Sequence, residues 1–476
     1  MIASYLLVSI IISALLFFNR NRRVNYLLVA AFALLQWALI SWSFLHRDEE
    51  VLYGFFKSDA LALLMLTTLG IVTIPAFYHS YVYFSNPEGN ARERGIFFMS
   101  MTILLAAVSG AYLSNHIAVT WVFVELTTLA ASGLIYHHRD APALEGTWKY
   151  IFVCSISITF VFIGILFLSI ALQQAGHVEL TYPALLHAAG SLDIFWLRLS
   201  LIFIFTGFTA KLGLVPMYTA GIDAKDKAPS PAGALFSTVL MNMGFVGFFR
   251  FYEVIAHTTI HDWADNVIFI AAGLSVFVAA VYMIKVENIK RMLAYSSIEH
   301  IGLVMLGLAA GGVGYYAAIL HLVLHAFTKS SMFFQMGQVY RIYRSKHISD
   351  TGNYFQYNLP GAMVLLLAFI CATAMPPSGL FISEFMIFRA LFEGHHPFLL
   401  VVVLVLLTMI IWAFGKNIFR LLFTPPVHFD AAKAGRVSGY ESVSQFVLLG
   451  LVIYLGFNPP ALMVELIQDA VKNLIP

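Results

Sequence analysis

The sequence predicts an all-α integral membrane protein with about fourteen transmembrane helices, two of them broken. Of its 476 residues, 60% are hydrophobic and only 11% are charged, whereas a soluble globular domain carries about 25% charged residues. Apolar runs recur along the chain, and each is close to the ~20 residues that a helix needs to cross the hydrocarbon core. A water-soluble fold is therefore excluded, and a net charge of +2 gives no basis for binding nucleic acid.

The apolar runs mark the predicted spans in order. They cover residues 1–18, 24–44, 59–84, 96–113, 115–137, 149–173, 194–215, 231–256, 266–285, 291–309, 313–340, 358–394, 397–424 and 444–470. The first run lacks a basic n-region and a small-residue cleavage site, and three arginines (Arg20, Arg22 and Arg23) follow it. We therefore expect a retained first span rather than a signal peptide.

Two predicted spans carry helix breakers. The seventh runs into Gly213 and Pro216, and the twelfth is interrupted by Pro376, Pro377 and Gly379. Proline lacks an N–H donor and clashes with the preceding turn, and such a break at membrane depth is tolerated inside protein or beside a water-filled cavity. A packing kink explains a single proline, but two breaks in matching positions, together with buried charges, favour an ion-transport site.

The basic residues of the loops predict the orientation of the chain. Those after odd-numbered spans include Arg20, Arg22, Arg23, Lys225, Lys227, Lys290, Arg341, Arg344 and Lys433, against Arg47, Lys57, Arg198, Arg250, Arg389 and Lys472 on the other side. Cytoplasmic loops carry the excess of Lys and Arg. We therefore predict a multi-pass protein of the cell inner membrane with both termini on the outer, periplasmic side.

The two cysteines, Cys154 and Cys371, both lie inside apolar runs, and the chain has no CxxC motif. This excludes an iron–sulfur cluster and haem c on ligand count. We expect this chain to bind no cofactor and to catalyse no reaction alone. If it serves a redox process, the electrons travel through another subunit.

Eight of the ionisable side chains inside predicted spans are candidates for ion transport. They are Glu125, Lys211, Glu299, His300, His321, His325, Lys329 and Glu384. An ionised residue at a helix centre costs about 2.5–3.5 kcal/mol on insertion scales, so such residues need partners, water or both, and they mark ion pathways. We predict that these eight residues carry protons across the membrane.

Three of them follow one another at intervals of four residues, so His321, His325 and Lys329 share one helix face. Eight residues at 1.5 Å each cover about 12 Å, roughly a third of the membrane. Two histidines four apart also suggest a metal ligand pair, but the HExxH pattern of zinc enzymes is absent. We expect no metal here and predict a proton relay.

Lys211 and Glu125 suggest a second way in which the chain could move a proton. If the carboxylate of Glu125 approaches and leaves Lys211, the affinity of the lysine amine for a proton rises and falls, and a proton moves. The alternative is a static ion pair that only holds two helices together.

Several long motifs carry a family resemblance. Lys290–His300 (KRMLAYSSIEH), Ile319–Lys329 (ILHLVLHAFTK) and Ala228–Leu235 (APSPAGAL) resemble the antiporter-like membrane subunits of respiratory complex I, Mrp antiporters and group 4 membrane-bound hydrogenases. Glu145–Tyr150 (EGTWKY) and Pro377–Glu384 (PSGLFISE) look like the branch of hydrogenase-4 component F.

The resemblance implies that two inverted five-helix repeats make up most of the fourteen helices. Residues 1–95 would hold spans one to three, and residues 96–256 the first repeat, spans four to eight. Residues 257–425 would form the second, inverted repeat, spans nine to thirteen. Residues 426–476 would hold a loop and the last span.

The resemblance also implies roles for the buried residues. Glu125 matches the family's glutamate on span five, which Glu299 would mirror in the second repeat, and Lys211 matches the central lysine on broken span seven. The span-eleven relay corresponds to His321, His325 and Lys329, and Glu384 corresponds to the residue that faces the exit half-channel. His300 ends the motif that carries Glu299.

Span eight departs from the family pattern. Family members carry a lysine or histidine there as a bridge between the half-channels, whereas the candidate positions here are Ser237 and Asn242. Neither side chain titrates near neutral pH. A proton would have to cross this point through water that these two side chains order.

The function implied by the resemblance is that of a proton-translocating subunit in a hydrogenase-4-like or related respiratory (NADH/quinone-type) complex. Other membrane subunits and a peripheral redox arm would be its partners. One alternative is an Mrp-type Na⁺/H⁺ antiporter or a subunit for cation-driven uptake of inorganic carbon. Another is a membrane anchor that does not pump, which Ser237 and Asn242 favour.

Overall fold

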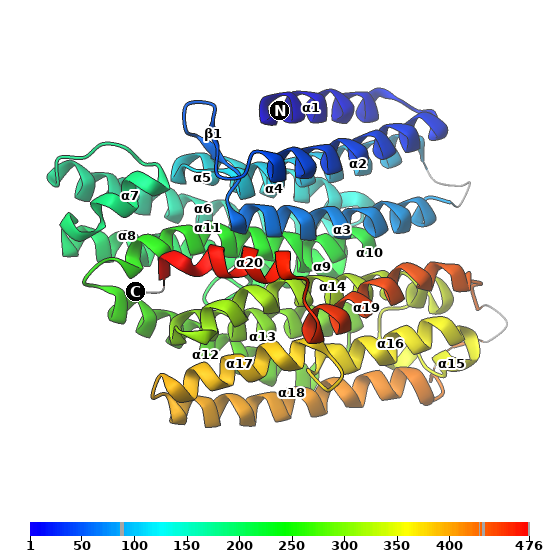
Figure 1. The fold of residues 1–476 in the computed structure, drawn as a ribbon. Coiled ribbons are helices and arrows are strands. Elements are labelled where there is room, and N and C mark those ends of the chain that lie inside the picture. The colour runs from blue at the N-terminus through cyan, green and yellow to red at the C-terminus, as the bar shows by residue number, and fades with distance from the viewer. Residues whose placement is uncertain (86–89, 428, 431–433, 475–476) are drawn as a thin grey trace.

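The structure of the chain is a computed structural model that describes residues 1–85, 90–427, 429–430 and 434–474. It is a bundle of helices that run side by side, with α1 at one edge and α18 at the opposite edge (Figure 1). Within the described residues, the only paired strands are β1 (Glu50–Val51) and β2 (Phe56–Lys57), which form a short antiparallel hairpin. The predicted all-α membrane fold is confirmed.

The described residues of the N-terminal half form eleven α-helices. They are α1 (Ile2–Phe18), α2 (Arg22–Leu45), α3 (Ala60–Tyr83), α4 (Ala91–Leu113), α5 (Ile117–Ile135), α6 (Ala141–Gln174), α7 (Tyr182–Ala188), α8 (Ile194–Leu212), α9 (Thr219–Lys227), α10 (Ser230–Ser237) and α11 (Val239–Ala256).

The C-terminal half continues the bundle. Its helices are α12 (His261–Lys285), α13 (Ile289–Ala310), α14 (Val313–Tyr343), α15 (Tyr354–Tyr357), α16 (Leu359–Ala372), α17 (Gly379–Glu393), α18 (Pro397–Phe423), α19 (Val443–Phe457) and α20 (Ala461–Val471). Twelve helical segments of the described residues are long and apolar enough to cross a membrane, and α1 and α16 are shorter apolar helices. Every predicted span coincides with helix, while the count of fourteen crossings and the repeats stay predictions.

Both predicted helix breaks are confirmed. Helix α8 ends at Leu212, and Gly213 follows it in the left-handed conformation (φ +78°) that glycine adopts without strain. The chain becomes helical again only in α9. In the same way, α16 ends before the two prolines, and α17 begins at Gly379 beyond them.

Two spans that the sequence predicts as continuous helices are interrupted in the structure. Residues 231–256 are interrupted at Thr238, where φ −125° and ψ −84° separate α10 from α11. No proline or glycine marks this point. The range 444–470 is divided into α19 and α20 at Asn458, Pro459 and Pro460, because proline cannot donate the helical hydrogen bond and disfavours helix in the residue before it.

The centre of the bundle is formed by the helices that carry most of the ionisable residues. In the most apolar stretch of α10–α11, of α13 and of α14, 100% of the residues are buried. In the corresponding stretches of α6 and α18, only 39% of the residues are buried. The outer helices therefore present apolar faces of the kind that contact lipid. The inner helices are surrounded by protein, so side chains on them are shielded from the hydrocarbon.

Three basic residues counted above as loop charges are buried instead. Lys225 and Arg250 are 3% exposed and Lys290 is 5% exposed. Arg250 lies within α11, where its guanidinium donates to the backbone oxygens of Tyr112, in the last turn of α4, and Ser114, just after that helix. These buried residues are weaker evidence for the orientation of the chain in the membrane than exposed basic residues are. Lys433 lies outside the described residues.

Candidate functional site

Seven of the eight predicted ionisable residues are buried in the centre of the bundle. These are Lys211, Glu299, His300, His321, His325, Lys329 and Glu384, all no more than 8% exposed. Glu125 is half-buried on α5. Lys211 lies in the last turn of α8, and α13, α14 and α17 carry the other six, so helices from both halves of the chain contribute.

Lys211 is held by hydroxyl groups. Its Nζ donates to Thr128 Oγ1 at 2.8 Å, and to Thr127 Oγ1 and the Tyr150 hydroxyl at 3.3 Å each. The two threonines lie on α5 and the tyrosine on α6. A charged amine can form three such bonds, so these hydroxyls compensate for part of the water that Lys211 loses on burial.

Glu125 is not paired with Lys211. No nitrogen–oxygen distance of 4.0 Å or less joins the two side chains among the ion pairs of the described residues, and one carboxylate oxygen of Glu125 is buried without a hydrogen-bond partner there. Because Glu125 lies less than one turn before Thr127 and Thr128 on α5, it stands near the amine but apart from it. The arrangement is not the static ion pair that was the alternative.

Lys211 also packs closely against the neighbouring helix α11. A Cβ atom added at Gly244 would come within 2.9 Å of Lys211 Cβ and 3.0 Å of the Leu212 nitrogen. The absence of a side chain at Gly244 therefore allows α8 to approach α11 at the lysine. This contact brings the backbone of Lys211 close to α11, the helix that leads to the second half, while its amine points toward α5 and α6.

In the second half, Lys329 of α14 donates from Nζ to Ser296 Oγ of α13 at 2.5 Å. Its amine also lies 5.8 Å from the ring centre of Phe414 on α18, which is within the range of a cation–π contact. Glu299 follows Ser296 by three residues on α13, so its carboxylate lies on the same face of that helix. Lys329 is thus another buried lysine bonded to a hydroxyl.

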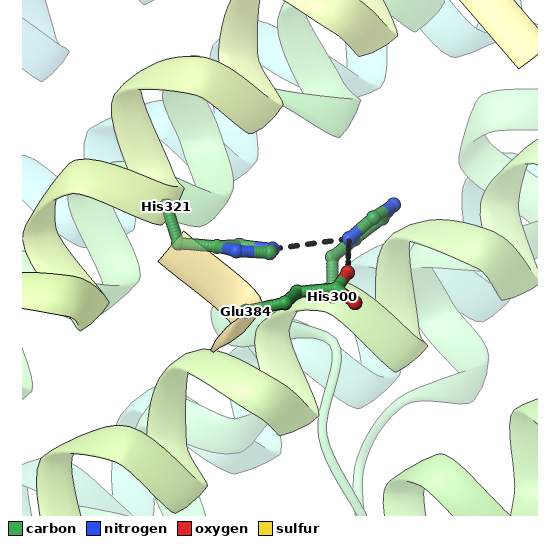
Figure 2. Close-up of side chains that lie close together, drawn as sticks. All are labelled: His300, His321 and Glu384. Carbon is green, nitrogen blue, oxygen red and sulfur yellow. Dashed lines mark hydrogen bonds and ion pairs between the residues drawn. The ribbon is translucent and has the colours of Figure 1, made fainter. Parts of the chain in front are cut away.

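His300 connects three helices (Figure 2). Its Nδ1 lies 3.0 Å from His321 Nε2 of α14 and 3.9 Å from Glu384 Oε1 of α17. It is also 3.6 Å from Glu299 Oε1 on its own helix. The other ring nitrogen of His321 is 2.9 Å from Ser383 Oγ. The four titratable groups form one cluster.

His325 completes the face predicted from the sequence. Its ring centre lies 5.2 Å from that of His300, so His321 and His325 both point toward α13. Neither nitrogen of His325 has a hydrogen-bond partner among the described residues. A buried polar group without a protein partner is normally satisfied by water. The face therefore continues from the His300 cluster toward Lys329.

The same cluster offers donors for a metal ion, since the ligand atoms of His300, His321 and Glu384 lie within 4.8 Å of one another. Two nitrogens bound to one zinc ion at 2.0–2.1 Å in a tetrahedral site are about 3.3 Å apart. The two histidine nitrogens here are 3.0 Å apart, the length of a direct hydrogen bond. The observed geometry suits a shared proton better than a shared metal ion.

The two candidates on span eight lie on either side of the break at Thr238. Ser237 ends α10 and Asn242 lies in the first turn of α11, and both are completely buried. The Ser237 hydroxyl and both polar atoms of the Asn242 amide have no hydrogen-bond partner among the described residues. Their placement fits the predicted role of ordering water.

The sequence analysis missed the residues that hold the buried groups in place. These are Thr127, Thr128 and Tyr150 around Lys211, Ser296 at Lys329, and Ser383 at His321. Serine and threonine are common in membrane helices, so composition alone does not single them out. Tyr150 belongs to a motif that the resemblance used, but nothing in its spacing indicated contact with Lys211.

Comparisons with known proteins identify the family and the fold of the chain. The profile of the NADH:quinone oxidoreductase/Mrp antiporter transmembrane family matches residues 114–410. A hydrogenase-4 component F homologue from Methylacidiphilum infernorum is 29% identical over 348 residues, which make up 71% of this chain and 73% of the relative. The NADH-quinone oxidoreductase subunit N of Halorhodospira halophila is 25% identical over 397 residues, 80% of this chain and 78% of the relative.

A solved structure shares the fold. It is a chain of the membrane-bound sulfane sulfur reductase, an archaeal respiratory membrane complex, with a TM-score of 0.87 and 20% sequence identity. The match covers 100% of this chain and 97% of that chain.

Proposed function

Since this chain belongs to the NADH:quinone oxidoreductase/Mrp antiporter transmembrane family, we propose that it translocates protons as a membrane subunit of a hydrogenase-4-like or related respiratory complex. The observation that carries the proposal is the cluster in which His300 joins Glu299, His321 and Glu384 across three helices. Titratable groups at such distances can exchange protons directly or through one water molecule.

In this proposal residues 96–256 and 257–425 are the two inverted repeats. Each range contains a broken helix and a buried lysine, Lys211 in the first and Lys329 in the second. Broken helices in corresponding positions of two halves are typical of the ion sites of transporters. Protons would pass from Glu125 and Lys211 to Lys329 and the histidines, and leave by Glu384.

The energy for this movement would come from redox chemistry in other subunits. Moving one charge against 100 mV costs about 2.3 kcal/mol. This chain would bind no redox cofactor itself, and other membrane subunits and a peripheral redox arm would be its partners. It would lie in the inner membrane with both termini on the outer side, as the loop charges predict.

The hydrogenase-4 branch is supported by the relative from Methylacidiphilum infernorum, to which the chain is 29% identical. A Na⁺/H⁺ antiporter or a subunit for cation-driven uptake of inorganic carbon would use the same fold with another ion or partner. A non-pumping anchor is favoured by one observation only, the lack of a titratable residue at Ser237 and Asn242.

The test is proton uptake by the complete complex in proteoliposomes, driven by its own electron donor and acceptor and followed with a pH-sensitive dye. Replacing Lys211 by Met should abolish the part of the uptake that passes through this chain while the complex still assembles, because methionine matches the length of lysine without a titratable amine. If the Lys211→Met complex takes up protons at the wild-type rate, this chain does not pump protons, and the non-pumping membrane anchor remains as its function. Uptake of Na⁺ in place of protons would favour the antiporter.

A further inference from the structure

Between the buried lysines of the two halves, span eight offers no titratable side chain at its candidate positions. A lysine from another helix reaches this region. Lys225 lies near the end of α9, the short helix that follows the break after α8, and is only 3% exposed. Its Nζ lies 3.2 Å from Met241 Sδ, and Met241 directly precedes Asn242 on α11.

The side chain of Met241 reaches the region of Lys211. Its Cε lies 3.1 Å from the Cβ position of Gly213, two residues after Lys211. Gly244, which Lys211 contacts, follows Met241 by three residues on α11, so both contacts lie on one helix face. The amine of Lys225 and the backbone around Lys211 therefore meet the same face of α11, with Met241 between them.

The backbone of Lys225 also lies close to the second half. A Cβ atom placed at Gly233 of α10 would be 3.4 Å from the Lys225 carbonyl oxygen and 3.0 Å from the Phe333 ring of α14. Phe333 follows Lys329 by four residues, so the two share one face of α14. Lys225 thus lies where α9, α10 and the lysine-bearing face of α14 converge.

Within the part of the chain that the structure describes, Lys225 has no carboxylate partner. The carboxylates beside it in sequence bond elsewhere: Asp223 pairs with Arg291, and Asp226 lies 3.3 Å from Lys227. Among the ion pairs of the described residues, none includes Lys225. A methionine sulfur is only a weak acceptor. A buried ammonium without a carboxylate partner destabilises the folded protein, so the burial of Lys225 here lowers stability.

Three buried polar groups on α10, α11 and α14 have no hydrogen-bond partner among the described residues. They are the Ser237 hydroxyl, the Asn242 amide and the His325 ring. Such groups are sites for buried water, which can carry a proton between two groups too far apart for a direct bond.

We propose that Lys225 is the proton-carrying bridge between the two halves of this chain, in the role that the family gives to a titratable residue on span eight. The inference rests on the proposed function. In one step the Lys225 ammonium gives a proton through water to the side of His325 and Lys329, and becomes a neutral amine. In the next step the amine takes up a proton from the side of Lys211, so that one charge has crossed.

The test compares four forms of the complete complex in proteoliposomes, all driven by the same electron donor: wild type, Lys211→Met, Lys225→Met and Lys227→Met. Lys227 is the matched control because it lies on the same helix and is 28% exposed beside Asp226. We expect Lys225→Met to lower the rate of proton uptake at least tenfold and Lys227→Met to leave it within twofold. If Lys225→Met takes up protons at the wild-type rate while Lys211→Met does not, the proposed bridge is wrong and the proposed function stands. If all four forms take up protons at the wild-type rate, the proposed function is wrong.

Two further variants separate proton transfer from a structural role, with co-purification of the partner subunits as the check on assembly. Lys225→Arg keeps the positive charge but cannot release a proton, so it should also fail, and full activity of this variant contradicts the proposal. The double variant Lys225→Met/Asn242→Lys returns an amine to span eight. This variant should restore part of the proton uptake, which a change in packing alone would not do. If the double variant assembles but takes up no more protons than Lys225→Met, the proposed bridge is contradicted.

Discussion

At the scale of single residues, two of the buried lysines, Lys211 and Lys329, bond to hydroxyl groups rather than to carboxylates. Lys211 bonds to Thr127, Thr128 and Tyr150, and Lys329 bonds to Ser296. A hydroxyl stabilises an ammonium less than a carboxylate does, and it leaves the amine free to respond to an approaching charge. This suits a group that must both take up and release a proton.

The hydroxyl of Tyr150 gives a prediction at this scale. Tyr150→Phe removes one of the three hydrogen bonds to Lys211 while keeping the ring that packs 5.4 Å from the amine. A hydrogen bond to a charged group contributes about 1.5–3 kcal/mol, so we expect proton uptake by the complex to change by about tenfold with assembly unaffected. Tyr454→Phe, on an exposed tyrosine, should leave uptake unchanged. Equal uptake by Tyr150→Phe and wild type would show that the hydroxyl does not tune Lys211.

The sequence predicts the residues of the site that share one helix better than those that meet across helices. Spacing alone placed His321, His325 and Lys329 on one face, as the structure has them. The contact of Lys225 with Met241 depends on how α9 packs beside α10 and α13, which places the lysine side chain at α11. Loop charge counting assigned Lys225 to the surface, because composition does not tell a buried lysine near a helix break from an exposed one.

At the scale of helices, the prolines and the length of the apolar runs predicted most of the boundaries. The break at Thr238 escaped prediction because it is made by the local backbone without proline or glycine. The last predicted span was drawn through Asn458, Pro459 and Pro460, although two prolines in a row are the strongest local signal against helix.

A close approach of two helices gives the prediction at this scale. A Cβ atom at Gly379, where α17 begins, would come 2.3 Å from the backbone oxygen of Val452 and 2.8 Å from Gly456 Cα on α19. Small residues permit such contacts between membrane helices. Gly379→Ala should therefore destabilise the protein by about 1–3 kcal/mol, as overpacking does, and lower the melting temperature of the purified complex in detergent.

The matched control for this prediction is on the same helix pair. A Cβ atom at Gly450 of α19 would meet nothing within 4 Å, so Gly450→Ala should leave the melting temperature unchanged or raise it, since alanine favours helix. Equal melting temperatures for the two variants would mean that α17 and α19 are not in the close contact described here.

At the scale of the whole molecule, the ends of the chain lie toward the same end of the bundle (Figure 1). Arg47, which follows α2, lies 3.1 Å from Glu465 of α20 and also pairs with Asp469, so the C-terminal helix is tied to the loop after the second span. An even number of crossings between the two termini would give this arrangement.

The orientation of the termini is testable in cells. Alkaline phosphatase is active only outside the cytoplasm, so a fusion at the C-terminus should be active and a fusion in the loop after α14, at the exposed Arg344, should be inactive. The reason is the excess of basic residues in the loops on the side of Arg344. The reverse pattern of activities would invert the orientation, and equal activity at both sites would contradict the number of crossings between them.

The central claim is that protons cross the membrane through buried residues of this chain, and the number of protons taken up per electron transferred by the complete complex tests it most directly. The measurement is made in proteoliposomes with the wild-type chain, with Lys211→Met and with Lys329→Met. Electrons should still pass through the other subunits in all three complexes, while the ratio should fall to the same lower value in both variants, since either break interrupts one route. An unchanged ratio in both variants, with electron transfer intact, would contradict proton transport through this chain.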